Sequence, residues 1–335
     1  MKILIAGGCG FIGSNLSIFL KKKKFKILSI DNLSKNYCLL NEKRLKYNKI
    51  KNLRVNLLNK KKLNYIGFKP DLIIDCAAEP AVEVSSKNPD AVVENNFNTT
   101  LNLLSLAKKY NSKLIFLSSS RIYPINKSYE YFKIKKKKYF DENITDNGPR
   151  SIYGFSKFAS ELLIQEYSYA FNIKYIINRL GLTTGPWQFG KVEQGLVSLW
   201  LWSHYKSKNL NYIGYGGTGR QIRDVLDIDD LCDLIHKQIK MSNKIYNHTF
   251  SVGGGKESFF KLKELTKFCE KITQNQIEIK KIKKTSKYDI PYYISSNLKV
   301  NKFYGWKISN SFEDTLNKTF LWMKKNNKLL NKYFK

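Results

Sequence analysis

The chain has 335 residues, 42% hydrophobic and 14% aromatic, the composition of a globular protein with room for one large or two smaller α/β domains. It has no apolar run of 18 residues, its apolar start is too short for a signal peptide, and its five cysteines show no metal-ligand spacing. We therefore expect a cytoplasmic protein with reduced thiols, no metal and no membrane partner. The net charge of +32 comes mostly from lysine, with only seven arginines, which favours a solvated surface and no specific nucleic-acid partner over an RNA-binding face.

The first predicted element is a buried strand over Lys2–Ala6, which leads into a glycine-rich turn. Gly7, Gly10 and Gly13 fit the pattern G-x-x-G-x-x-G, and a helix over Ser14–Leu20 follows. Glycines at such a turn let the backbone approach a pyrophosphate, which binds at the helix N-terminus. This stretch therefore predicts a dinucleotide site.

A second predicted strand, Phe25–Ile30, ends at Asp31. Asp31 lies 18 residues beyond Gly13, where a carboxylate would bind the adenosine ribose hydroxyls. A carboxylate at this position repels a 2′-phosphate, so the sequence favours NAD over NADP.

Strands and helices continue to alternate, which predicts a Rossmann-type doubly wound parallel sheet in an α/β fold. A helix is expected at Asn96–Tyr110, and the small residues Ala77 and Ala78 would let the backbone pass close to a cofactor. The remaining expected strands are Asn52–Leu57, Asp71–Ala77, Lys113–Ser118, Lys174–Gly181 and Asn247–Val252.

A Tyr-x-x-x-Lys pair at Tyr153 and Lys157 follows a serine-rich strand end at Ser118–Ser120. The spacing occurs six times in this lysine-rich chain, so it carries little information alone. Its context within an apolar-periodic helix sets this pair apart. On a helix the two side chains share a face, and a nearby cation can bring a tyrosine towards a working pKa for proton transfer.

The later part of the chain is less regular. A long polar loop is expected at Asn126–Pro149, a helix at Gln194–Lys206, a turn at Tyr215–Arg220 and an acidic helix start at Asp227–Asp230. Residues 1–181, with 222–253 returning to them, are expected to form the NAD-binding domain. A smaller substrate-binding lobe is expected from 182–221 and 254–335, the latter made of lysine-rich helices and short strands.

Together these residues make the chain resemble the extended short-chain dehydrogenase/reductases of the NAD-dependent nucleotide-sugar epimerase/dehydratase family. The resemblance covers nearly the whole length, and it implies that Ser119, Tyr153 and Lys157 are catalytic. The residues that it assigns to NAD are Gly7, Gly10, Phe11, Ile12, Gly13, Asp31, Asn32, Ala77, Ala78, Asn96, Tyr153 and Lys157.

Within the family, the chain is most similar to CDP-paratose 2-epimerases. This similarity rests on Gln188-Phe189, on Glu193-Gln194-Gly195 and on the run Gly219–Leu226. It implies a nucleotide-sugar substrate, with a CDP-sugar favoured, and a role in lipopolysaccharide or capsule O-antigen biosynthesis. The residues that it assigns to the substrate are Ser119, Ser120, Arg121, Gln188, Gln194, Arg220 and Arg223.

The implied reaction is an epimerisation through a keto-sugar. Tyr153 removes a hydroxyl proton while NAD accepts hydride from the same carbon, and the hydride then returns to the opposite face. Ser120-Arg121 stands where dehydratases of the family carry Asp-Glu, which argues against water elimination. A UDP- or GDP-sugar epimerase acting at C4 stays open, as does a non-catalytic RNA-binding protein of this fold.

Two further expectations come from the resemblance. The chain should form a homo-oligomer through the exposed faces of Asn96–Tyr110 and the Tyr153 helix. Some positions depart from the family pattern: Asp75 stands where a histidine is common, Asn56 where an Asp often contacts adenine, and Leu182 and Trp187 where Asn and Arg occur in relatives.

Overall fold

A computed structural model describes residues 1–79, 88–125, 139–144, 147–190 and 195–334. The chain divides into two compact units, and the division differs from the expected functional domains in placing 123–150, 180–181, 222–231 and 251–253 with the second unit. A division into compact units does not show which residues bind NAD. The boundaries of the NAD-binding domain and of the substrate-binding lobe therefore stay a prediction. The first unit comprises Met1–Ile122, Ser151–Arg179 and Cys232–Phe250, and the second comprises Tyr123–Arg150, Leu180–Leu231 and Ser251–Lys335.

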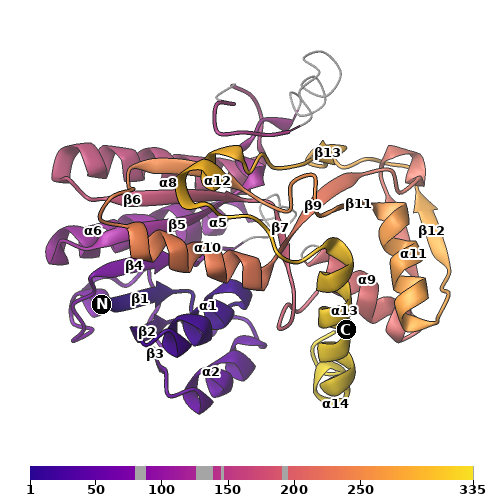
Figure 1. Ribbon diagram of the computed structural model, residues 1–335, viewed down its shortest axis with the longest axis horizontal. Helices are drawn as coiled ribbons and strands as arrows, with labels where there is room; N and C mark the ends of the chain where they lie inside the picture. The colour runs from indigo at the N-terminus through magenta and orange to yellow at the C-terminus, as the bar shows by residue number, and fades with distance from the viewer. Residues whose placement is uncertain (80–87, 126–138, 145–146, 191–194, 335) are drawn as a thin grey trace. The chain divides into compact units, whose positions relative to one another are not determined.

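The first unit is built on a seven-stranded sheet with the order β10-β6-β5-β4-β1-β2-β3 (Figure 1). The pairs β1–β2, β1–β4, β2–β3 and β4–β5 are parallel. The order reverses between β1 and β4, which is the switch point of a doubly wound sheet, so the predicted fold class is confirmed. The strands are β1 Lys2–Ala6, β2 Lys26–Ile30, β3 Lys51–Leu53, β4 Leu72–Asp75, β5 Lys113–Ser119, β6 Tyr175–Leu180 and β10 His248–Val252.

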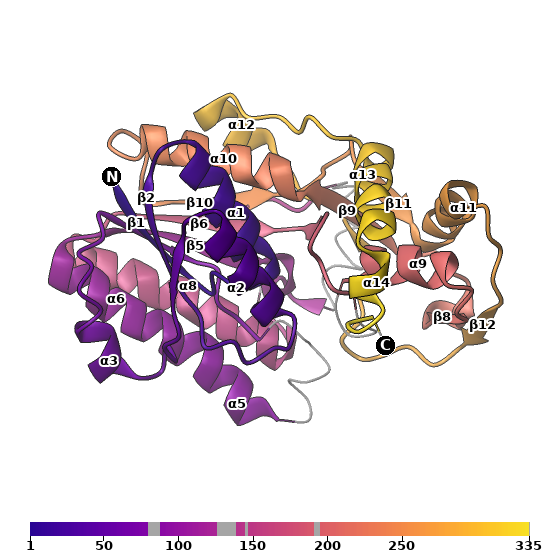
Figure 2. The ribbon, with the colours of Figure 1, turned by 90° about the horizontal axis from the view of Figure 1, so that it is seen from below.

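Helices cover both faces of this sheet, with α1 and α10 on one face and α6 and α8 on the other (Figures 1 and 2). Strand β1 shows why: Ile3, Leu4, Ile5 and Ala6 are all fully buried, as expected of a parallel strand that is covered on both sides. The helices here are α1 Phe11–Lys22, α2 Cys38–Tyr47, α3 Lys60–Asn64, α5 Pro89–Val93, α6 Thr99–Tyr110, α8 Ser151–Phe171 and α10 Ile228–Met241.

Two predicted strands are shorter in the structure because side chains of their own residues form turns. The carboxylate of Asp75 accepts a hydrogen bond from the backbone N–H of Ala77, which ends β4 at Asp75. The side chain of Asn56 likewise accepts from the backbone N–H of Leu58, and β3 ends at Leu53. Both turns lie at the carboxyl edge of the sheet, where ligands of such sheets bind.

The expected helix at Asn96–Tyr110 starts differently from the prediction. A π-helical turn over Glu94–Asn98 precedes α6, which then runs from Thr99 to Tyr110. Single π-turns are rare and occur mostly at functional sites. The turn contains Asn96, one of the residues assigned to NAD.

The second unit contains a four-stranded sheet, a two-stranded sheet and five helices in its described residues. In the larger sheet, β9 pairs with β7, β11 and β13, and in the smaller one β8 pairs with β12. The strands are β7 Leu182–Thr184, β8 Leu210–Ile213, β9 Ile222–Asp227, β11 Phe259–Lys261, β12 Ile279–Ile282 and β13 Tyr292–Tyr293. The helices are α9 Leu196–Tyr205, α11 Leu262–Thr273, α12 Leu298–Tyr304, α13 Phe312–Lys325 and α14 Asn327–Leu330.

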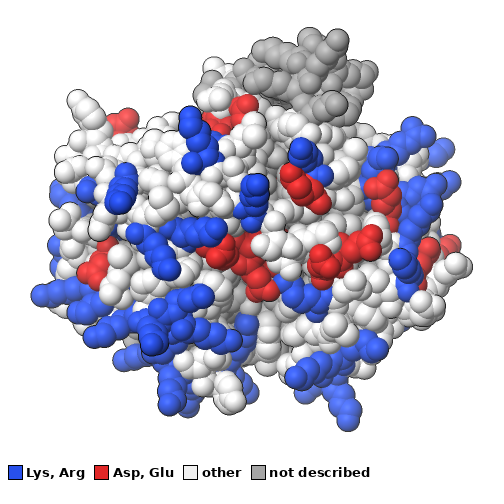
Figure 3. Space-filling model, viewed as in Figure 1, with Lys and Arg blue, Asp and Glu red and all other residues white. Residues whose placement is uncertain are grey.

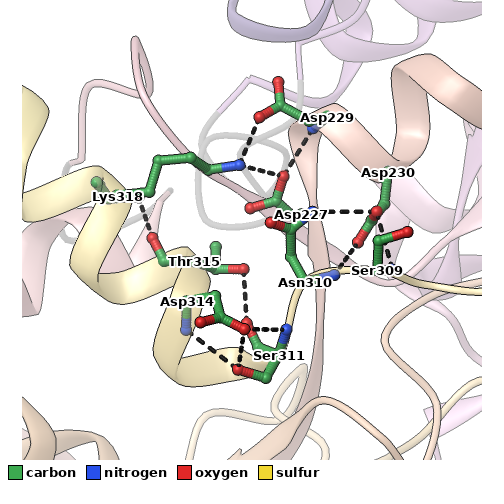
Figure 4. Close-up of polar contacts among 10 residues, drawn as sticks. Asp227, Asp229, Asp230, Ser309, Asn310, Ser311, Asp314, Thr315 and Lys318 are labelled. Atoms are coloured by element: carbon green, nitrogen blue, oxygen red, sulfur yellow. Dashed lines mark hydrogen bonds and ion pairs between the residues drawn. The ribbon is translucent and has the colours of Figure 1, made fainter.

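The acidic segment at the end of β9 anchors α13 (Figure 4). Lys318 of α13 donates to Asp227 at 2.7 Å and to Asp229 at 2.5 Å. Asp230 accepts from the backbone N–H groups of Ser309 and Asn310, just before α13 begins. These carboxylates therefore have structural partners, which explains an acidic helix start in a chain so rich in lysine.

The lysine excess lies at the surface. Lys and Arg spread widely over the face drawn in Figure 3, with Asp and Glu interspersed among them. Among the described residues, no helix combines the length and the apolarity that crossing a membrane requires. All five cysteines are free thiols, and four of them are buried.

Candidate active site

The glycine turn after β1 is packed too closely for side chains. A Cβ added at Gly13 would lie 2.2 Å from the carbonyl oxygen of Gly7, and one added at Gly7 would lie 2.8 Å from Cα of Ala77. Gly7 also has φ of +70°, a conformation that glycine adopts at little cost. The turn brings three chain segments together at the N-terminus of α1, whose N-cap Gly10 has no side chain to cover it.

Asp31 lies at the end of the neighbouring strand β2 and is 7% exposed. Its two carboxylate oxygens accept hydrogen bonds from the backbone N–H groups of Cys9, at 3.0 Å, and Leu33, at 2.8 Å. Burial raises the pKa of Asp31, and these two bonds oppose that shift. A carboxylate offers about four lone pairs, so two acceptor positions remain for ribose hydroxyls.

These features fit a bound NAD molecule. The glycine turn leaves no side chain between the backbone and a pyrophosphate at the start of α1, and Asp31 holds a fixed carboxylate one strand away. Phe11 and Ile12 form the first turn of α1, and Asn32 follows Asp31. The assignment of each of these residues to NAD stays a prediction.

Asn96 links the loop after β4 to the helix that carries Tyr153. Its side chain accepts from the backbone N–H of Glu79 at 2.8 Å and donates to Ser156 Oγ at 3.0 Å. Ser156 Oγ in turn donates to the backbone carbonyl of Tyr153 at 2.9 Å. Asn96 is 2% exposed, so this network fixes α8 against the loop that begins with Ala77 and Ala78.

Tyr153 and Ser119, which the resemblance assigns to the catalytic set, lie close together in this unit. Tyr153 lies in the first turn of α8, and the side chain of Ser119, at the end of β5, lies within reach of its phenol. Burial raises the pKa of Tyr153, while Ser119 and the positive charge of Arg121 oppose the shift. Ser119 Oγ also accepts from the backbone N–H of Arg121 at 3.2 Å, which orients the hydroxyl.

Lys157 lies one turn after Tyr153 on α8 and is 3% exposed. Its ammonium sits 4.1 Å from the centre of the Phe116 ring. Burial lowers the pKa of Lys157, and the charge of Asp75 is the main influence that opposes the shift. The cation that lowers the pKa of Tyr153 in this structure is Arg121, so the expected effect of Lys157 on Tyr153 stays a prediction.

Ser120, another substrate candidate, follows Ser119 in the first unit. Gln188, Arg220 and Arg223 lie in the second unit, where two of them have structural partners. Gln188 is buried and bonds to the Thr183 carbonyl and the hydroxyls of Thr184 and Ser198. Arg223 donates to Asp289 at 2.9 Å and to two backbone carbonyls. Arg220 is exposed, and Gln194 lies outside the described residues.

Sequence reasoning missed several residues that support this site. Glu161 accepts from Ser118 and Arg179, and Asp75 accepts from Thr100. Glu161 follows Lys157 by four residues, which places both on one face of the helix and was a usable signal. Asp75 had only its departure from the family pattern to mark it.

Comparisons with known proteins find relatives that match nearly the whole chain. A CDP-paratose 2-epimerase from Salmonella typhi is 27% identical over 96% of this chain and 99% of its own length. A UDP-glucuronic acid 4-epimerase from Bacillus cereus, crystallised with UDP-glucuronic acid and NAD, is 25% identical, with a TM-score of 0.84 over 97% of this chain and 99% of that one. A UDP-glucose 4-epimerase from Thermotoga maritima shares the fold, with a TM-score of 0.86 at 24% identity over 98% of this chain and 100% of that one.

The family model described as NAD dependent epimerase/dehydratase family matches residues 3–253, which is most of the chain. The match spans the glycine turn, the end of β5 and the helix of Tyr153, the segments that carried the resemblance seen in the sequence. The chain therefore belongs to the NAD dependent epimerase/dehydratase family, whose cofactor is NAD.

Proposed function

We propose that this protein is a nucleotide-sugar epimerase that inverts one carbon of its sugar, with a CDP-linked deoxyhexose inverted at C2 as the favoured substrate. The observation that carries the proposal is the proximity of Ser119 to the phenol of Tyr153, with Lys157 on the next turn of the same helix. The similarity to the CDP-paratose 2-epimerase over nearly the full length supports the choice of substrate.

The roles of the three side chains follow from their chemistry. Tyr153 exchanges a proton with the sugar hydroxyl at the reacting carbon, and Ser119 holds that oxygen by a hydrogen bond. Lys157 supplies a buried positive charge beside them. NAD, when bound, supplies the reversible hydride transfer, and Gly7, Gly13 and Asp31 would hold it.

The atoms balance without an outside oxidant. The sugar carbon loses a hydride and its hydroxyl loses a proton to Tyr153, which gives a keto-sugar. After the keto-sugar presents its other face, both the hydride and the proton return to it. The product is the epimer, and the protein and its cofactor end in their starting states.

Epimerisation is favoured over dehydration by the residues beside Ser119. Water elimination needs a second acid and base, a role that suits carboxyl groups. The two residues after Ser119 are Ser120 and Arg121, and neither side chain is a carboxylic acid. Glu79, which does influence the pKa of Tyr153, is paired with Lys35 at 2.5 Å.

The test is proton NMR of CDP-paratose incubated with the purified protein and a catalytic amount of NAD. We expect inversion at C2 without accumulation of reduced cofactor. Loss of the 6-hydroxyl as water from a CDP- or dTDP-hexose would instead identify a dehydratase and overturn the proposal.

The alternative substrate class is a UDP- or GDP-sugar inverted at C4. The structural similarity to the UDP-glucuronic acid 4-epimerase favours keeping it. Parallel incubations with UDP-glucose, UDP-glucuronic acid and GDP-mannose distinguish the two substrate classes. Turnover of only a UDP-hexose at C4 would show that the C2 assignment is wrong, while the protein would still be an epimerase.

A further inference from the structure

The ammonium of Lys157 is buried within the first unit, so keeping it protonated costs free energy. The side chain is 3% exposed, and the nitrogen lies against the face of Phe116 rather than in water. A buried ammonium loses its proton or its stability unless a counter-charge lies close by. The carboxylate that supplies this counter-charge therefore determines whether Lys157 stays protonated.

Asp75 lies beside the ring that carries this ammonium. Asp75 is the last residue of β4 and pairs in register with Phe116 of β5. Residues in register on neighbouring parallel strands direct their side chains to the same face of the sheet. The alternating partners on that face, Ile73 and Leu114, pack in one core cluster with Phe116, as this register requires.

The other nearby carboxylate already has a cation. Glu161 is bonded to Arg179 through both of its oxygens, at 2.8 to 3.2 Å, and also accepts from the hydroxyl of Ser118. The guanidinium of Arg179 therefore already balances the charge of Glu161, which is then not available to balance the charge of Lys157. The ion pair is itself buried, with 7% and 1% of the two side chains exposed.

The hydrogen bonds described at Asp75 come from neutral donors only. The hydroxyl of Thr100 donates to Oδ2 at 2.9 Å, and the backbone N–H of Ala77 donates to Oδ1 at 3.0 Å. Burial raises the pKa of this carboxyl, and the charge of Lys157 and these two bonds oppose the shift. Because the donors are neutral, the bonds supply no counter-charge to Asp75. Among the groups that face Lys157, Asp75 opposes the lowering of its pKa most, ahead of Cys76 and Glu161.

We propose that Asp75 is the counter-ion of Lys157, a positioning residue that keeps this ammonium charged one helical turn after Tyr153. The proposal rests on the proposed function only for the work that Lys157 performs. The charge of Lys157 itself can be measured without substrate or turnover.

The test is NMR titration of the purified protein labelled with 13Cε-lysine. The Phe116 ring should shift the Lys157 signal away from the exposed lysines, and loss of that signal in Lys157→Arg assigns it. We expect Asp75→Asn to lower the pKa of Lys157 by about one unit or more, as loss of a neighbouring opposite charge does. Thr100→Val keeps the carboxylate and should give less than half of that change.

Equal titration of Lys157 in the parent protein and in Asp75→Asn would overturn the proposal, because Asp75 would then be protonated or too remote. If the protein inverted no sugar nucleotide, the proposed function would be wrong, but the result of the titration would still hold.

A second measurement covers the case in which Asp75→Asn alone does not fold. We expect the double variant Asp75→Asn with Lys157→Met to fold and to melt at a higher temperature than Lys157→Met alone. The reason is that Lys157→Met alone leaves a buried carboxylate without its counter-ion. A double variant that melts no higher than Lys157→Met would contradict the pairing.

Discussion

Arg179 and Glu161 form a buried ion pair behind the candidate active site, with Nη2 of the arginine 2.8 Å from Oε2 of the glutamate. Ser118 hydrogen-bonds the same carboxylate from the strand that ends at Ser119. The pair thus joins β6 to α8 at the level of Lys157, which precedes Glu161 by one helical turn. The contacts of this pair therefore hold the end of β5, β6 and α8 together.

We expect Glu161→Gln to destabilise the protein by about 3–5 kcal/mol, because it leaves the Arg179 guanidinium buried without its counter-charge. Chemical denaturation monitored by circular dichroism measures the change. The matched control is Glu42→Gln, which breaks an ion pair to Arg54, a side chain that is 64% exposed. Exposed pairs contribute up to about 1 kcal/mol, so equal losses in the two variants would contradict the reading of Glu161.

Tyr153→Phe removes the phenol oxygen and keeps the ring that is packed in α8. We expect kcat to fall by about 10² to 10⁴, the usual contribution of a positioned acid or base, while bound NAD is retained. Single-turnover assays and absorbance of the cofactor released on denaturation measure the two quantities. Undiminished turnover would remove Tyr153 from the reaction.

Gly13→Ala tests the cofactor turn. The added Cβ would lie 2.2 Å from the carbonyl oxygen of Gly7, so the turn must open and NAD affinity should fall by at least tenfold. Gly67→Ala is the control, because its Cβ meets no atom within 4 Å and the backbone strain from its φ of +64° falls outside the turn. Isothermal titration with NAD distinguishes a local effect from general destabilisation, which both variants would share.

The raised pKa of Asp224, a residue of the second unit, predicts that the stability of the protein depends on pH. Burial raises the pKa of this fully buried carboxyl from 3.8 to about 6, against hydrogen bonds from Ser295 and Gly255. A carboxyl that binds its proton more tightly when folded stabilises the protein at low pH. That contribution is fully present below about pH 4 and is lost as the pH rises through 6.

Between pH 4 and 7, the free energy of unfolding of the parent should therefore fall relative to that of Asp224→Asn, by on the order of 3 kcal/mol for a shift of this size. Urea denaturation at several pH values gives the difference, in which the other titrating groups largely cancel. A difference that stays constant with pH would show that Asp224 does not titrate in this range.

The sequence predicted the sheet and the placement of Tyr153 and Lys157 on one helix well, because both depend on local pattern. Buried strands such as Lys2–Ala6 are continuous apolar runs, and Tyr153 and Lys157 share a helix face at a fixed spacing. The supporting network was not predictable in this way. Asp75 and Thr100 are 25 residues apart, and Asn96 and Ser156 are 60 apart, so only the folded chain brings them together.

The second unit was harder to predict for a related reason. Gln188 and Arg223 were assigned to the substrate from the motifs around them, yet the described contacts of Gln188 are all within the unit. A polar side chain that looks available in sequence can be used by the fold to satisfy backbone groups of irregular segments. Motif identity therefore predicted the family, while the roles of Gln188 and Arg223 towards the substrate stay a prediction.

The homo-oligomer expected from the family has a candidate surface on α8. Phe155, Leu162 and Tyr169 follow one another at seven-residue intervals and are 53%, 48% and 90% exposed, so they form one apolar stripe along the helix. Phe155→Lys with Leu162→Lys places two charges on this stripe. We expect the pair to convert a dimer into a monomer in multi-angle light scattering, because a second copy of α8 would have to bury both ammonium groups. Leu298→Lys, on α12 and at a position 80% exposed, should leave the mass unchanged. A parent protein that is already monomeric, or a double variant that stays dimeric, would contradict this interface.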